Sequence, residues 1–347
     1  MNIKLVISFT FLLLFSFNIN LFTQSEAALP FLTLPVSPLN AGMGTTGTSL
    51  PSNDVFGFLS NPAQLGYLSQ HTNLSVQLYP EESKIGDVFS YNSLAFNLGY
   101  NFEKLIGYPL SLGIGYNRTT NELLFLQDNI DSYNAFSFGV GIDYYVEFSA
   151  GYTFKDISSE LGDVSARVSA YDIGFLLNVP VTKLIIPEYD LNFSGTIELK
   201  PELNFSVGYA QSNIGDKIYY IDPAQSDPLP RTAKMGYSVS VGFKEVSMKI
   251  PLEIFHLDFS AEAKDYLINR DITGASSYQP AFGDINIAKN IFGIKGDDNV
   301  YANSGFKIEL LETAVLMRGH SGRSYGLSSS NGYGLKAGGL FKVFADN

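Results

Sequence analysis

Apolar and polar residues alternate with a period of two along most of the chain. The clearest apolar runs lie at alternate positions within residues 94–102, 110–116, 136–144, 146–154, 171–179, 203–209 and 235–243. Such alternation over about ten residues predicts β-strands with two chemically different faces. Tyr or Phe commonly closes a run, as Tyr144 and Phe154 do.

The second face of these strands is small and neutral rather than charged. Ser111, Gly113, Gly115 and Asn117 alternate with one apolar run, and charged residues make up only 16% of the chain. A soluble antiparallel sheet also alternates, because one face packs on a core. Its outer face is usually rich in Lys and Glu. We therefore expect an all-β fold, a transmembrane antiparallel β-barrel of about 14 strands over residues 73–347.

One segment changes the parity of its apolar positions. They are even from Val246 to Ile254 and odd from Phe255 to Ala261. A slip of one residue moves side chains to the opposite face, so we expect a β-bulge near Ile254-Phe255. Beyond it, the other face carries His256, Asp258, Ser260 and Glu262, as a solvated inner wall or as a polar ladder with a binding role.

The two ends of the chain also carry signals. Lys4, the apolar run from Leu5 to Phe17 and the small residues around Ala27 predict a cleaved signal peptide over residues 1–27. The apolar run is short for a membrane-anchoring helix. Near the other end we expect a tight turn at Leu311-Glu312 and a last strand over residues 335–344.

The stretch between the signal peptide and the first strand contains two motifs. Gly42, Gly44 and Gly47 spell the dinucleotide-binding pattern G-x-G-x-x-G. That pattern has meaning only between a strand and a helix, and the prolines on either side and the lack of an acidic residue at the right distance argue against this setting. We interpret it as a flexible glycine turn that leads to a short helix, after which Asn61-Pro62-Ala63 redirects the chain.

These motifs resemble the start of the PorV/PorQ family of outer-membrane proteins, relatives of the FadL-like transporters. The resemblance rests on residues 41–44 and 61–65, and extends to residues 212–218, 227–232, 305–307 and 316–320. It implies that residues 28–72 form a plug, with Gly42, Gly44, Asn61, Pro62 and Ala63 as its motif. The chain departs from barrel-assembly signals because it does not end in an aromatic residue.

Candidate chemistry is sparse. The chain has no cysteine and a net charge of −12, which exclude thiol chemistry and argue against nucleic acid as a partner. His71, His256 and His320 belong to no catalytic motif, and residues 296–299 lack the spacing of a calcium loop. We expect no enzymatic activity, no cofactor and no metal site.

The long insertion from Lys264 to Asn303 is rich in large apolar residues. They include Tyr278, Phe282, Ile291 and Phe292. A contiguous apolar patch commonly marks a contact surface. The insertion is expected either to cap the extracellular mouth or to receive a partner protein.

The resemblance implies two functions, and we consider a third beside them. The first is binding of translocon or cargo proteins in type IX protein secretion, at the bacterial outer membrane. The alternative is a FadL-like transporter that holds a hydrophobic small molecule in its lumen. The third is a structural or adhesive barrel without transport.

Overall fold

The computed structural model describes residues 27–70, 74–85, 89–123, 129–185, 191–193, 197–270, 275–323 and 326–346, so the expected signal peptide lies outside the described residues apart from Ala27. The strands are β1 (Leu74–Ile85), β2 (Phe89–Asn101), β3 (Leu110–Leu123), β4 (Asn129–Tyr144), β5 (Val146–Leu161), β6 (Val164–Pro180), β7 (Leu191–Phe193), β8 (Ile197–Gly215), β9 (Thr232–Glu245), β10 (Leu252–Tyr266), β11 (Ile268–Arg270), β12 (Ser276–Tyr278), β13 (Val300–Leu310), β14 (Ala314–Arg323) and β15 (Gly326–Leu335). The helical elements are η1 (Pro30–Thr33), α2 (Pro38–Gly42), α3 (Gly57–Ser60), α4 (Gln64–Gln70), α5 (Glu103–Ile106), α6 (Val181–Ile185), η2 (Pro223–Gln225), the π-helical turn η3 (Ile287–Phe292) and α7 (Gly338–Asp346).

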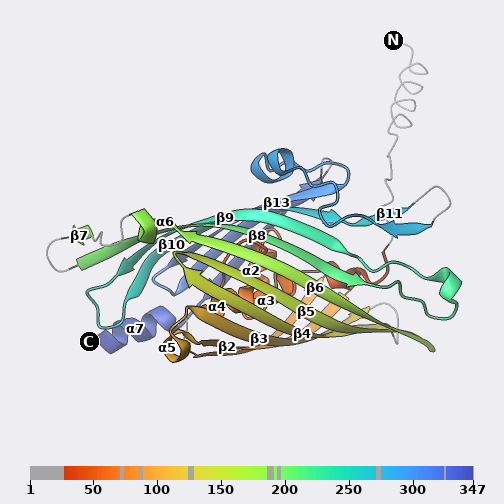
Figure 1. Ribbon diagram of the computed structural model, residues 1–347, viewed down its shortest axis with the longest axis horizontal. Helices are drawn as coiled ribbons and strands as arrows, with labels where there is room; N and C mark the ends of the chain where they lie inside the picture. Colours follow the sequence, from red (N-terminus) through yellow and green to blue (C-terminus); the bar gives the residue numbers. More distant parts are fainter. Residues whose placement is uncertain are drawn as a thin grey trace, which may run out of the picture.

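One antiparallel sheet of thirteen strands makes up most of the molecule. Its order is β1-β2-β3-β4-β5-β6-β8-β9-β10-β13-β14-β15, with β7 paired to β8, and β11 and β12 form a separate hairpin. The sheet rolls around the N-terminal helices (Figure 1). The prediction of an all-β antiparallel fold is confirmed. The expected closed barrel of 14 strands is not reproduced. Among the described residues, no hydrogen-bonded pairing joins the two edge strands, β1 and β15.

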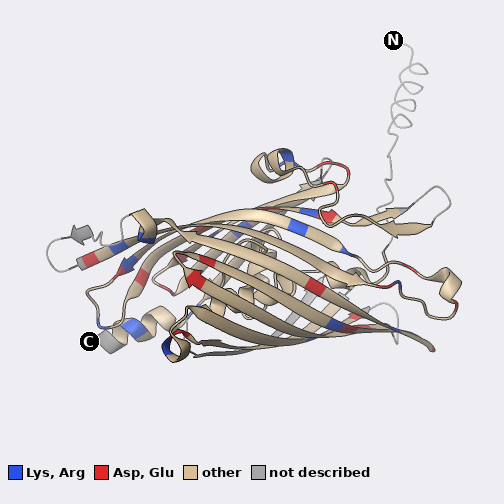
Figure 2. Cartoon of the chain, in the orientation of Figure 1, with Lys and Arg blue, Asp and Glu red and all other residues tan. Residues whose placement is uncertain are grey.

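The two faces of this sheet have the reverse of the usual polarity. Large apolar side chains stand exposed on the outer face, with exposed fractions of 54% for Phe136, 45% for Phe148 and 46% for Tyr152. The inner face is buried and polar. Its buried residues include Ser111, Asn117, Thr119, Ser137, Thr153, Ser159, Asn178, Ser206, Ser238, Ser260 and Asn303. The long strands are tan over most of their length in Figure 2, so charge is scarce along them.

The two ends of the rolled sheet differ in the length of their connections. At the end that carries α5 and α7, called the α5 end, β4 turns into β5 through Tyr145 alone, and β13 turns into β14 through residues 311–313. At the opposite end, called the β11 end, residues 267–299 form the longest connection of the sheet. Residues 216–231, also at the β11 end, equal in length residues 181–196, which join β6 to β8 at the α5 end. The tight turn expected at Leu311-Glu312 is confirmed, since both residues have positive φ.

The bulge is confirmed, and the expectation for the last strand is corrected. The β9–β10 register shifts between Glu253 and Phe255. The polar residues 156–163 mostly continue strands β5 and β6, because the ladder runs on past the apolar part of the outer face to the Leu161–Val164 pair. The last strand ends at Leu335, and residues 338–346 form α7, because their apolar residues recur at helical rather than alternating positions.

None of the helices within the described ranges is both long and apolar enough to cross a membrane. The N-terminal helices are instead short and buried on the inner face of the sheet. Helix α4 lies against strands β1 to β5, and α2 lies against β14 and β15. One short segment thus contacts the strands at both edges of the rolled sheet.

Candidate functional site

The N-terminal segment, residues 28–70, runs along the inner face from one end of the rolled sheet to the other. At the β11 end the Ala28 amide donates to Pro228 O at 3.0 Å, and Phe31 is 2% exposed. At the α5 end, Asn101 Nδ2 donates to Gln70 O at 2.8 Å. The segment therefore runs the length of the inner face of the rolled sheet rather than lying across one of its ends.

Asn61-Pro62-Ala63 sits at the centre of this contact. The fully buried Asn61 donates from Nδ2 to Thr48 O at 2.7 Å and to Phe175 O of β6 at 3.0 Å. Its Oδ1 accepts a hydrogen bond from the Ala63 amide at 3.0 Å. One side chain thus joins two parts of the segment to the wall, which explains why an amide stands at this position.

Gly42 and Gly44 lie at the other side of the lumen, against β13, β14 and β15. The Gly44 amide donates to Ser330 Oγ at 3.1 Å, and Ser330 Oγ donates to Gly42 O at 3.2 Å. Gly44 has φ of +70°, and a Cβ there would meet the backbone of His320 and of Ser304. Both the dihedral and the close approach require glycine.

A line of glycines crosses the inner face where the segment is seated. Gly99, Gly113, Gly139, Gly151 and Gly174 pair in register across β2 to β6. A Cβ would collide with the segment at four of them: with Leu65 at positions 113 and 139, with Pro62 at 151 and with Asn61 at 174. The glycines let the two backbones approach closely, so the wall is shaped for this segment.

Buried charge also fixes the segment. The carboxylate of Glu262, on β10, accepts from the amides of Gly47 at 3.2 Å and Thr48 at 3.0 Å. Within the segment, Ser37 Oγ donates to Asp54. Burial raises the pKa of the Asp54 carboxyl, and the hydrogen bonds from Ser37 and the Phe56 amide oppose that rise. Charge-assisted hydrogen bonds of this kind are among the stronger ones in proteins.

Ion pairs line the wall on both sides. Lys155 lies 2.8 Å from Asp172 and 2.9 Å from Asn213 Oδ1. Asp258 lies 2.8 Å from Lys307 and 2.9 Å from His256 Nε2. The residues expected on a polar ladder are thus on the inner wall, where Asp258 pairs with Lys307 of β13 and Glu262 contacts the segment.

Two further histidines, His71 and His320, occur in the sequence. His71 lies outside the described residues, and His320 stands exposed on the outer face of β14. Within the described ranges, no group of three or more histidine, aspartate or glutamate side chains is placed to hold a metal ion.

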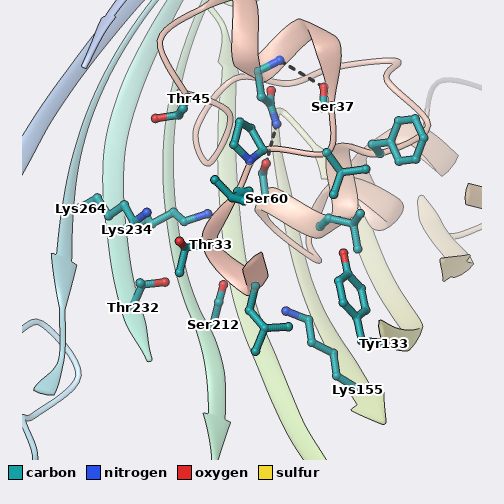
Figure 3. Close-up of a pocket in the computed structure, with 17 residues that line it drawn as sticks. Thr33, Ser37, Thr45, Ser60, Tyr133, Lys155, Ser212, Thr232, Lys234 and Lys264 are labelled. Carbon is teal, nitrogen blue, oxygen red and sulfur yellow. Dashed lines mark hydrogen bonds between the residues drawn. The ribbon is translucent and has the colours of Figure 1, made fainter. Parts of the chain in front are cut away.

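A small cavity lies between the segment and the wall (Figure 3). Its volume is about 60 Å³, and Thr33, Ser60, Lys155, Lys234 and Lys264 are among its lining residues. A space of this size holds a few water molecules. Pockets for drug-sized ligands are of the order of 300–1,000 Å³, so this cavity does not accommodate a long acyl chain.

The four apolar residues named in the insertion do not share one surface. Ile291 is 3% exposed, whereas Phe282 and Phe292 are 58% and 64% exposed. Tyr278 accepts the Leu229 amide at its hydroxyl, and Arg231 lies 3.5 Å from its ring centroid. Sequence reasoning missed the glycine line and Glu262 as contacts of the segment, because both depend on strand register.

Comparison with known proteins yields only distant structural similarity. No protein-family model and no curated protein matches the chain. CdiB from Acinetobacter baumannii aligns at a TM-score of 0.32 and 9% identity, over 72% of this chain and 49% of its own. The beta domain of the Bordetella autotransporter BrkA aligns at a TM-score of 0.34 and 7% identity, over 75% of this chain and 96% of its own. The translocator domain of the autotransporter NalP from Neisseria meningitidis aligns at a TM-score of 0.31 and 13% identity, over 75% of this chain and 86% of its own. Values this low do not establish kinship.

Proposed function

We propose that this protein is an integral outer-membrane barrel whose lumen is closed by its own N-terminal segment. The reversed polarity of the sheet carries the proposal. Bulky apolar side chains cover the outer face while serines, asparagines and ion pairs are buried inside. A contiguous apolar surface of this extent is unfavourable in water, and in a bilayer it is the surface that meets lipid.

The dimensions of the apolar band support this placement. On β5 the outward positions from Val146 to Phe154 are apolar, and Asp156 and Glu160 follow on the same face. That stretch measures about 27 Å along the strand, or about 21 Å in height at a tilt of about 40°. Membrane barrels have a band of about 25 Å, bounded by aromatic residues. Tyr144 and Tyr145, each 68% exposed, stand at its α5 end.

The ends of the barrel indicate its orientation. Short turns of outer-membrane barrels face the periplasm and long loops face the exterior. The longest connection, residues 267–299, lies at the β11 end, so we assign that end to the cell exterior and the α5 end to the periplasm.

At the finer level we propose a PorV/PorQ-type role, in which the barrel binds translocon or cargo proteins of type IX secretion. The residues that carry the resemblance are the ones that seat the segment in the wall. A filled lumen supports a function exercised by exposed surfaces rather than by conduction. FadL-like transport of hydrophobic molecules has less support, because the cavity between the segment and the wall has a volume of only about 60 Å³.

The exposed apolar residues of the β8–β9 connection provide a partner surface at the exterior end. Tyr219 is 49% exposed and Ile221 is 79% exposed. Replacing both with serine should abolish co-purification of translocon or type IX cargo proteins from detergent-extracted outer membranes. The reason is that a protein interface depends on a few apolar and aromatic contacts.

The matched control replaces Tyr108 and Ile106 with serine at the periplasmic end, where they are 72% and 45% exposed. This variant should retain the partners. If the Tyr219/Ile221 variant retained them equally, the docking role of this loop would be refuted.

A further inference from the structure

The long insertion packs against the outside of the barrel wall. Residues 279–299, here called the side lobe, place η3 against β9, β10 and β13. Phe292 stacks on Tyr237 of β9, with ring centroids 5.4 Å apart and planes at 25°. Phe282 lies 5.2 Å from the ring of Tyr209, whose hydroxyl donates to Ala281 O at 2.6 Å. Both tyrosines belong to the outward set of their strands, so the lobe covers the outer face instead of the mouth.

The wall under the lobe is adapted to receive it. Outward positions elsewhere carry bulky residues, whereas here they carry Ala261, Ala263 and Ala302, which are at most 5% exposed. Ile291 packs into this gap with Val300 and Ala263. The small residues show that the lobe is a built part of the wall.

The lobe is also held rigid by its own polar contacts. The 1% exposed Asn290 donates from Nδ2 to Lys295 O at 2.8 Å and accepts from the Asn286 amide at 2.7 Å. Asp265 of β10 accepts from the Asp284 amide at 2.6 Å. Its outward side nevertheless exposes four large apolar residues: Phe282 58%, Ile287 48%, Phe292 64% and Ile294 37%.

We propose that this side lobe is a lipid-contacting anchor that lies in the outer leaflet of the membrane. The inference rests on the proposed membrane placement of the barrel. Continuity with the lipid-facing surface identifies lipid as the occupant: Tyr237, under Phe292, lies 6.2 Å from the rings of both Phe205 and Phe259 on the outer wall. Exposed apolar residues that extend such a wall at its outer rim meet acyl chains near the headgroups.

Charged side chains are placed to remain at the aqueous boundary. Lys289 is 44% exposed and pairs with Asp297 at 2.8 Å, and Lys295 is exposed. Long lysine side chains near an apolar surface extend their charged ends toward water and headgroups. The lobe thus combines exposed apolar side chains with exposed lysines, as an interfacial element does.

The chain contains no tryptophan, so single substitutions give unambiguous fluorescent reporters. Phe292→Trp and Ile287→Trp report on the lobe, Phe138→Trp on the lipid-facing wall of β4 and Tyr219→Trp on the exterior loop. Each variant is reconstituted into phosphatidylcholine vesicles with acyl chains brominated either near the headgroup or near the chain end. Bromine quenches tryptophan only at short range.

We expect both lobe reporters to be quenched, and more strongly by bromine near the headgroup than by bromine near the chain end. Phe138→Trp should be quenched as well, and Tyr219→Trp should keep its emission. If the lobe reporters behaved like Tyr219→Trp while Phe138→Trp was quenched, the lobe would face water or a protein partner and the inference would be overturned. An unquenched Phe138→Trp would instead refute the membrane placement itself.

Discussion

Deleting residues 40–65 should convert a closed barrel into an open pore. The deletion removes Asn61, the Gly42–Gly44 turn and the amides that bind Glu262, which together hold the segment to three sides of the wall. The inner wall that remains is rich in serine, asparagine and charged side chains, so water and ions can fill the space that it encloses. Planar-bilayer recordings should show resolved channel steps for the variant and a closed baseline for the unaltered protein.

The control for this experiment is the assembled state of the shortened protein. Heat-modifiable gel mobility should show that the variant still folds into a barrel, because the sheet registers do not depend on the segment for their hydrogen bonds. A folded variant with the same closed baseline as the full chain would contradict the lumen-filling role of residues 40–65.

The second large effect is expected at the glycine line. Gly151→Ala adds a methyl group where the Cβ would overlap Pro62 and the Ala63 amide, both of which are backbone contacts that cannot rotate away. Overpacking of this kind costs about 1–3 kcal/mol. Urea unfolding in lipid vesicles should show that loss in the free energy of unfolding, together with faster proteolysis of the N-terminal segment.

Gly334→Ala provides the matched control. It makes the same chemical change on β15, where the added Cβ would meet Val315 at an ordinary 3.4 Å. We expect its stability and proteolysis to remain close to those of the unaltered protein. Equal behaviour of the two variants would show that position 151 is not a seat for the segment.

The period-two pattern predicted much of the sheet from sequence. The alternation placed Phe136 and Phe148 on the outer face and Ser137 and Ser149 on the inner one, because strand geometry fixes which side each residue takes. The parity change at Ile254-Phe255 predicted the bulge for the same reason. Small residues on the inner face, such as Gly113 and Gly151, leave the space in which the N-terminal segment lies.

Features that depend on register or on long-range packing were not predictable in this way. Gly113 and Gly151 lie far apart in the sequence, and only the pairing of the three strands β3, β4 and β5 aligns them. The sequence contained one indication of the side lobe that the alternation pattern alone did not reveal. Ala261 and Ala263 stand at outward positions where other strands carry bulky residues. At the C-terminus, Leu340 and Phe344 were read as strand residues although their spacing fits a helix.

The outer face of β5 offers the most direct test of the membrane placement. The chain has no cysteine, so spin labels can be attached at single cysteines replacing Phe148, Tyr152 and Glu160, which share that face. In reconstituted vesicles the labels at 148 and 152 should relax rapidly with oxygen and remain shielded from a water-soluble nickel complex. The label at 160 should show the opposite preference. Free access of the nickel complex to all three positions would contradict a lipid-facing wall, and with it the proposed barrel.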